Sequence, residues 1–257
     1  MQTRIDGESN VAFAITSGLK YYRKKELQMK RILCVLLILT MSIPLWGCTT
    51  GGSNYSDPAA DIRDAKKGEY ITFGEYEQDN NTTNGPEKIE WLVLKRTGNK
   101  ILVISKYCLD NQTYLGAAMK GTWDTSILRQ WLNDDFINTA FSTNEQGIIL
   151  QSYVPLDTEY HTDSGKETYD KIFLLSMSEA FEYFPSESSR KCKATSYAKA
   201  QGAQTDSYNY CLWWLRTRDR NSLGGEYVSN AGKIYHWGGG TETGCEAVRP
   251  VMWINVE

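Results

Sequence analysis

An apolar segment near the amino end decides which part of this chain can fold as a globular domain. Residues 29–48 read MKRILCVLLILTMSIPLWGC, in which Lys30 and Arg31 precede an apolar run from Ile32 to Trp46. A helix of that run, at 1.5 Å per residue, is too short to span about 30 Å of hydrocarbon comfortably, and a basic head before a short apolar core is typical of a cleaved export signal. We therefore exclude residues 1–47 from the fold.

The end of this segment resembles the signal of bacterial lipoproteins. In such signals the cysteine at the position of Cys48 is diacylated, and cleavage leaves it as the first mature residue, so Leu45-Trp46-Gly47-Cys48 implies lipidation of Cys48. Two acyl chains anchor a protein stably. The expected location is the extracytoplasmic face of the cell membrane, with the membrane as partner through the lipid. An uncleaved anchor is the alternative, because Trp46 stands where a small residue is usual.

The chain divides into four segments on this interpretation. Met29 already begins a complete signal, so we interpret residues 1–28 as a mis-called leader, with Met1 as the alternative start, and residues 29–47 as the signal peptide. Residues 48–66 are small and polar after the cysteine, which predicts a flexible tether. Residues 67–257 are expected to form a single globular domain.

The mature part is acidic and rich in aromatic side chains. Removing the seven Lys/Arg and three Asp/Glu of residues 1–47 leaves 21 basic and 28 acidic residues, a net charge of −7. An acidic chain without basic runs argues against nucleic acid as a partner. The whole chain has sixteen Tyr and eight Trp, which are many for its length. Such rings fill a core or form surfaces that bind sugars and peptides.

The mature part has four cysteines besides the acylated one: Cys108, Cys192, Cys211 and Cys245. An exported location permits disulfides. We favour a bridge of Cys192 with Cys211 or of Cys211 with Cys245, because these three lie within one stretch of the chain. Zinc is disfavoured, since no CxxC occurs and only two histidines are present. We expect no metal and no cofactor.

Hydrophobic periodicity predicts strands first and helices next. Residues 70–74 and a hairpin of residues 89–95 and 101–107 read as strands, with core positions at Trp91, Val93, Leu102 and Ile104. Residues 122–141 have helical spacing: Ile127, Leu128, Trp131 and Leu132 fall on one face, and Asp124 or Thr125 is the expected cap.

Shorter elements follow along the chain. Capping boxes at residues 143–146 and 176–179 predict two helix starts, the second helix ending before Pro185. Residues 172–175 read as a buried strand and residues 194–200 as a short helix. The last part predicts a terminal antiparallel sheet with strands at 212–217, 226–229, 233–237 and 247–254. The expected class is therefore α+β, with short helices packed on a twisted antiparallel sheet and a long loop region near the C-terminus.

Several separated motifs resemble, in order, an uncharacterised family of bacterial domains. Its hallmark is Trp-Trp-Leu-Arg-Ser-Pro-Gly followed by Val-Arg-Pro-Ala, and the chain has Trp213-Trp214-Leu215-Arg216 and Val248-Arg249-Pro250. The resemblance covers residues 68–257, and Thr217-Arg218-Asp219 departs from it. More distantly, the plan is similar to the C-type-lectin-like fold, including the sulfatase-modifying-factor branch, a likeness of fold alone. The calcium-binding motifs of such lectins do not occur.

Aromatic and basic residues near the C-terminus are the candidate recognition site. Trp213 and Trp214 point to opposite faces of a strand, so one is expected in the core and the other can line a surface, and the alternative is that both are core in a two-layer domain. Tyr235-His236-Trp237 precede three glycines, an arrangement suited to stacking on sugar or peptide. We expect Trp214, Arg218, Tyr235, His236 and Trp237 to contact the ligand. Arg216 and Arg249 are expected to anchor loops, with a ligand carboxylate as the alternative partner.

These observations predict a lipid-anchored, extracytoplasmic, non-catalytic binding domain. Its expected partner is a surface glycan, a peptide or an envelope protein. One alternative is a cell-surface enzyme related to sulfatase-modifying factors that uses Cys245 or His236, and another is a structural subunit of an envelope assembly. Catalytic signatures such as HExxH do not stand out.

Overall fold

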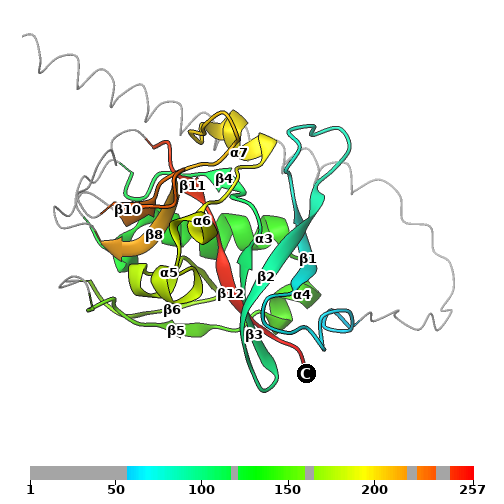
Figure 1. Ribbon diagram of the computed structural model, residues 1–257. Coiled ribbons are helices and arrows are strands. Elements are labelled where there is room, and N and C mark those ends of the chain that lie inside the picture. The colour runs from blue at the N-terminus through cyan, green and yellow to red at the C-terminus, as the bar shows by residue number, and fades with distance from the viewer. Residues whose placement is uncertain (1–56, 117–120, 160–164, 219–224, 236–243) are drawn as a thin grey trace, which may run out of the picture. The chain divides into compact units, whose positions relative to one another are not determined.

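The computed structural model describes residues 57–116, 121–159, 165–218, 225–235 and 244–257, which form one unit with Ser56 (Figure 1). The expected signal peptide, the acylated Cys48 and residues 49–56 of the expected tether lie outside the described residues. None of the helices in the described ranges combines the length and the apolar character that a membrane span needs.

The described chain begins with a segment that packs into the core. Ala59, Ile62 and Ala65 are buried, and they recur every third residue. Arg96 fastens the segment from outside, because its Nη1 donates to the backbone oxygens of Arg63 at 2.9 Å and of Ala65 at 2.8 Å. The tether expected over residues 48–66 was therefore wrong for residues 57–66, whose three buried side chains belong to the domain.

The first sheet contains the predicted hairpin. Its strand order is β1-β2-β3-β12-β7, with the bounds Tyr70–Tyr76, Glu87–Thr97, Lys100–Ser105, Val251–Asn255 and Ile172–Phe173. All its pairs are antiparallel. Trp91, Val93, Leu102 and Ile104 are buried as predicted, because apolar residues at every second position share one face. Trp91 also donates its Nε1 proton to the backbone oxygen of Phe73 at 2.7 Å.

The second sheet carries the C-terminal motifs. Its strand order is β10-β9-β8-β11-β4, with the bounds Ile234–Tyr235, Gly225–Val228, Trp213–Arg218, Ala247–Val248 and Asp110–Asn111. β11 runs parallel to β8, and the other pairs are antiparallel. A separate two-stranded sheet joins β5 and β6, residues Ser152–Val154 and Thr168–Asp170.

Short helices fill the connections, as the α+β class implies. They are η1 (Trp123–Thr125), α2 (Ile127–Trp131), η2 (Leu132–Phe136), α3 (Ile137–Ala140), α4 (Thr143–Ile148), α5 (Met177–Tyr183), α6 (Glu187–Arg190) and α7 (Ser196–Gln201). α2, η2 and α3 follow one another without a break, with η2 as a single π turn. Figure 1 shows them near the centre of the domain.

The helix starts test the predicted caps. Ser176 and Glu179 form the predicted capping box at α5. The other two predictions were wrong by one or two positions: Ser126 caps α2, and Ser142 with Glu145 caps α4. The predicted apolar face of the long helix is confirmed at Leu128 and Leu132, which are fully buried. Ile127 is 39% exposed, because it is the first residue after the cap.

The last strand region changes sheets in its middle. The sequence predicts one strand over residues 247–254, yet β11 pairs in the second sheet and β12 pairs with β3 and β7 in the first. Arg249 and Pro250 separate the two, and proline cannot donate to a ladder. The α+β class is confirmed. The single antiparallel sheet was wrong, because two five-stranded sheets share this C-terminal segment (Figure 1).

The turn before β10 contains a glycine that admits no side chain. Gly232 has φ +84°, and a Cβ there would lie 1.8 Å from the backbone oxygen of Glu187. Gly68 has φ +89°, but a Cβ there would meet no atom within 4 Å. An alanine would therefore have a strained backbone at both positions, but its Cβ would clash with a neighbouring backbone only at Gly232.

Gly232→Ala should destabilise the domain more than Gly68→Ala. A left-handed alanine costs about 1–2 kcal/mol, and overpacking adds roughly 1–3 kcal/mol at Gly232 only. Urea unfolding followed by tryptophan fluorescence would measure both variants. Equal losses of unfolding free energy would contradict the close packing of this turn on α6.

Candidate functional site

The residues expected to contact the ligand differ in their burial, and two of them lie outside the described residues. Arg218 ends β8 and is half-buried, and Tyr235 ends β10 and is 45% exposed. His236 and Trp237 lie outside the described residues. Trp214 is fully buried, so its expected place on the ligand surface was wrong.

Both tryptophans of the WWLR motif are core residues. Trp213 donates its Nε1 proton to the backbone oxygen of Arg190 at 3.1 Å, and Trp214 donates to that of Gln112 at 3.0 Å. Neither ring is exposed. Residues of a strand point alternately to its two faces, and β8 lies in the middle of its sheet with both faces covered. The motif therefore builds the fold.

A series of rings leads from this core to the surface. The Trp214 ring meets the Tyr227 ring edge-on, with centroids 6.5 Å apart at 90°. Tyr227 and Tyr235 lie directly opposite each other across β9 and β10, and their rings stack at 10° with centroids 5.5 Å apart. We call this tyrosine pair the stacked pair. Its outer member is exposed, so a flat ring backed by a second ring faces the solvent.

A buried carboxyl group lies beside the stacked pair. Glu246, just before β11, is 1% exposed, and its Oε2 has no hydrogen-bond partner in the described part of the chain. Burial raises the pKa of Glu246 to about 7, because a charged carboxylate is poorly solvated there. Burial and the nearby Glu246 carboxyl together raise the pKa of Tyr227. The sequence had no signal for this site, since an isolated glutamate before a strand reads as surface.

Thiols replace the disulfides predicted from the sequence. In the described residues Cys108, Cys192, Cys211 and Cys245 form no disulfide, and the first three are buried. Burial raises the pKa of the Cys108 thiol. Neither predicted bridge is present. Cys211 instead directs its Sγ to the backbone oxygen of Cys192 at 3.4 Å. Cys245 is half-buried near Tyr227.

The two motif arginines have the anchoring role predicted for them. Arg216 is 4% exposed, and its guanidinium holds both carboxylate oxygens of Glu179 and the backbone oxygen of Leu174. Arg249 donates from Nε to the backbone oxygen of Ser105 at 3.0 Å. These contacts hold both guanidinium groups inside the domain, while Arg216 Nε and Arg249 Nη1 have no hydrogen-bond partner among the described residues.

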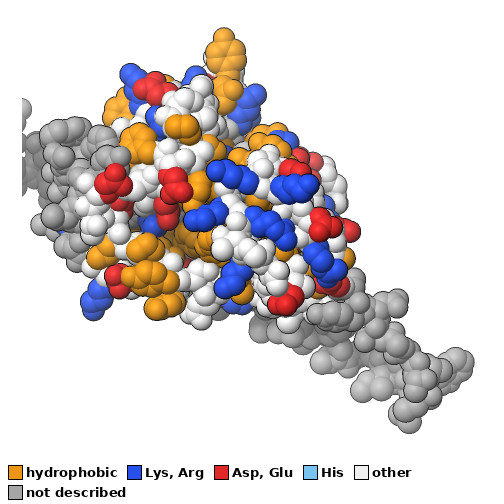
Figure 2. Space-filling view, turned by 60° about the horizontal axis from the view of Figure 1, so that its bottom comes forward, with side chains coloured by type: hydrophobic (Ala, Val, Ile, Leu, Met, Phe, Trp, Pro, Cys, Tyr) orange, Lys and Arg blue, Asp and Glu red, His pale blue; other side chains and the backbone are white. Residues whose placement is uncertain are grey.

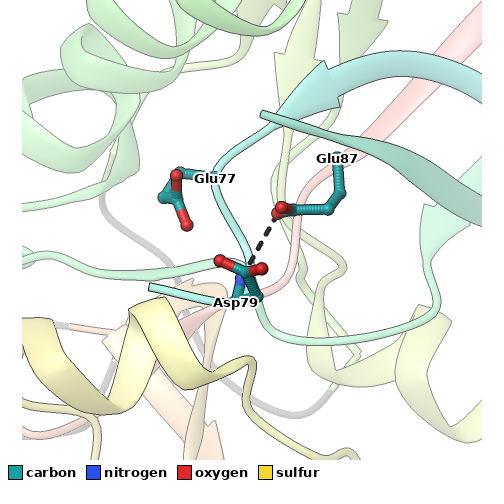
Figure 3. A group of neighbouring side chains, drawn as sticks. All are labelled: Glu77, Asp79 and Glu87. Atoms are coloured by element: carbon teal, nitrogen blue, oxygen red, sulfur yellow. Dashed lines mark hydrogen bonds between the residues drawn. The ribbon is translucent and has the colours of Figure 1, made fainter. Parts of the chain in front are cut away.

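Three acidic side chains gather at the β1–β2 loop. Carboxylate oxygens of Glu77, Asp79 and Glu87 lie within 4.8 Å of one another (Figure 3). Backbone N–H groups already donate to all three: Asn81 to Glu77 at 3.0 Å and to Asp79 at 2.6 Å, and Gln78 to Glu87 at 2.7 Å. The hydrogen bond from Asn84 lowers the pKa of Asp79. We assign these carboxylates to holding the loop.

The raised pKa of Glu246 predicts a pH-dependent stability. The folded state keeps the proton up to about pH 7, whereas the unfolded chain releases it near the ordinary value of 4.5. The unfolding free energy should therefore fall as the pH rises from 4.5 to 7, by about 3 kcal/mol. Glu246→Gln should remove this fall. The unfolding free energy of the variant, relative to that of the wild type, should therefore be higher at pH 8 than at pH 5.

Urea unfolding at pH 5 and pH 8 would measure this difference. Glu69→Gln is the control, because it removes one carboxylate from an exposed position. If Glu246→Gln kept the wild-type pH dependence, the buried carboxyl would not be the cause.

Comparison with known proteins agrees with the motif resemblance. No curated protein and no solved structure matches the chain. A family described as "Domain of unknown function (DUF6273)" matches residues 98–256, more than half of the chain, from the turn of the β2–β3 hairpin to the end of the first sheet. The matched region includes the stacked pair, Glu246 and both anchoring arginines. The chain belongs to the DUF6273 family.

Proposed function

We propose that this chain is a lipid-anchored, extracytoplasmic, non-catalytic binding domain that recognises a surface glycan, a peptide or an envelope protein. The observation that carries the proposal is the stacked pair of Tyr227 and Tyr235. One exposed ring, held flat by a second ring at 5.5 Å, offers a rigid face to a sugar or a peptide side chain. Held rings lose little conformational entropy on binding.

The surroundings of the stacked pair support a role in ligand recognition rather than in core packing. Tyr235 lies on β10, at the edge of its sheet, and β9 backs it. The buried carboxyl of Glu246 lies near Tyr227, and burial raises its pKa to about 7, so part of the molecules carry its proton at neutral pH. A C-type-lectin-like fold remains part of the proposal; it rests on the plan of short helices followed by turn-rich strands.

The anchor belongs to the same proposal. Cys48 closes a segment with the order of a lipoprotein signal, and the described residues of the domain begin at residue 57, nine positions later. We place the domain on the extracytoplasmic face of the cell membrane on this ground.

Labelling with a palmitate analogue would test the anchor. Cells that express the full chain should incorporate the label, and Cys48→Ala should lose it, because the thiol is the acylated group. Cys34→Ala, in the apolar run of the signal, is the matched cysteine control. Unchanged labelling of Cys48→Ala would refute the anchor.

Binding to a glycan array and to isolated cell walls would test the recognition site. Tyr235→Ala should weaken binding about tenfold, since one lost aromatic contact is worth about 1.4 kcal/mol at the upper end. Tyr153→Ala is a matched control, because Tyr153 is 49% exposed and also contacts a cross-strand tyrosine, Tyr169, at 5.6 Å. Equal effects of the two substitutions, or no binding by the wild type, would count against the stacked pair.

A further inference from the structure

Three extended segments form a small ladder around the buried cysteines. Cys108 pairs with Ala194 in parallel, and Lys193 pairs with Tyr210 in antiparallel fashion. Backbone hydrogen bonds of 2.9–3.0 Å join the segments, from Cys108 to Lys193, from Ala194 to Asn209 and from Cys211 to Cys192. The inner face of this ladder carries the buried cysteines. Alternation along each segment therefore directs the intervening residues to the outer face.

Lys191, Lys193 and Tyr210 occupy that outer face in contact with one another. The Nζ atoms of Lys191 and Lys193 each lie 5.4 Å from the centroid of the Tyr210 ring. The Nζ of Lys106 lies 5.3 Å from the Tyr107 centroid. Tyr208 lies in the turn before Tyr210, where Asn209 has φ +66°, and is 71% exposed. We call Tyr107, Lys191, Lys193, Tyr208 and Tyr210 the tyrosine–lysine surface.

The acidic groups beside this surface are already engaged. Glu90 binds the ammonium of Lys106 at 2.7 Å. Asp206 accepts hydrogen bonds from the backbone nitrogens of Tyr208 and Tyr210, both at 2.9 Å. Lys191 and Lys193 form no ion pair with another described residue, and both are exposed. Two positive charges thus lie over one tyrosine ring without an ion pair to another described residue, in a mature chain whose net charge is −7.

This combination differs from an ordinary basic face. Figure 2 shows Lys and Arg side chains gathered on the side of the domain that lies at the bottom of Figure 1, where the β2–β3 hairpin ends. The hairpin lysines Lys95 and Lys100 are exposed, but they lie opposite Leu102 and Thr97. Charge alone is present there. The tyrosine–lysine surface adds rings that can stack on a sugar to ammonium groups that bind carboxylate or phosphate as point charges.

We propose that the tyrosine–lysine surface binds an anionic polysaccharide, with its sugar rings against Tyr208 and Tyr210 and its acidic groups at Lys191 and Lys193. This inference rests on the proposed function, since it takes the domain to recognise a glycan outside the cytoplasm. It adds a second surface to that of the stacked pair and states the charge of the ligand.

Titration of the full chain in detergent with polygalacturonate would test the inference. The wild type should bind, and the affinity should fall as salt rises, because the polymer's charges are screened. Lys191→Glu/Lys193→Glu should weaken binding at least tenfold. Lys95→Glu/Lys100→Glu changes the net charge by the same amount on the hairpin and should alter the affinity less than twofold. Tyr208→Ala should weaken binding without changing the salt dependence.

The remaining outcomes would overturn the inference. They are absence of binding, equal losses from the two double substitutions, equal affinity for inorganic polyphosphate, which has charge but no sugar ring, and tighter binding of single-stranded polydeoxythymidine. Tyr235→Ala separates this inference from the proposed function. If polygalacturonate binding is lost at Lys191 and Lys193 and unchanged at Tyr235, the tyrosine–lysine surface stands, whatever the glycan array shows for the stacked pair.

Discussion

The placement of Arg249 is the interaction on which the two-sheet architecture depends. Its guanidinium lies between the rings of Phe184 and Trp213, 5.0 and 5.1 Å from their centroids, and its Nε donates to the backbone oxygen of Ser105. One side chain therefore joins β3 of the first sheet, the end of α5 and β8 of the second sheet. Removing a buried guanidinium would leave these groups without a partner. Pro250 follows at once, so the chain leaves one sheet and enters the other at this point.

Arg216 holds the central strand of the second sheet against a helix, whereas Arg249 joins the two sheets. Its contacts with Glu179 and Leu174 hold β8 against α5. Thr217, the next residue, donates to Asp157 at 2.9 Å, and Asp157 also accepts from the backbone nitrogen of Ser178 at 3.0 Å. β8 is thereby held along its length. Tyr227 packs on that fixed strand through Trp214, and the exposed ring of Tyr235 is consequently held by the core.

Local patterns were predictable where the chain's own neighbours decide the outcome. The hairpin of β2 and β3 and the capping box of Ser176 follow from alternation and cap chemistry. The predictions of disulfide bridges and of an exposed Trp214 were wrong for the same reason. Each depends on what lies across the sheet, and spacing along the chain does not contain that information. Residues 57–66 failed similarly, because three small or apolar side chains gain their burial only from the domain.

The sequence by itself determined the α+β class, the anchoring roles of the two motif arginines and the expectation of an exported, lipidated chain. Composition, short-range periodicity and motif order carry those properties. Only the tertiary structure decided that the WWLR tryptophans are core, that Glu246 is a buried carboxyl beside the stacked pair, and that lysines and tyrosines from three segments share one surface. These features need residues far apart in the chain to meet, and their burial or contact sets both their pKa and their exposure.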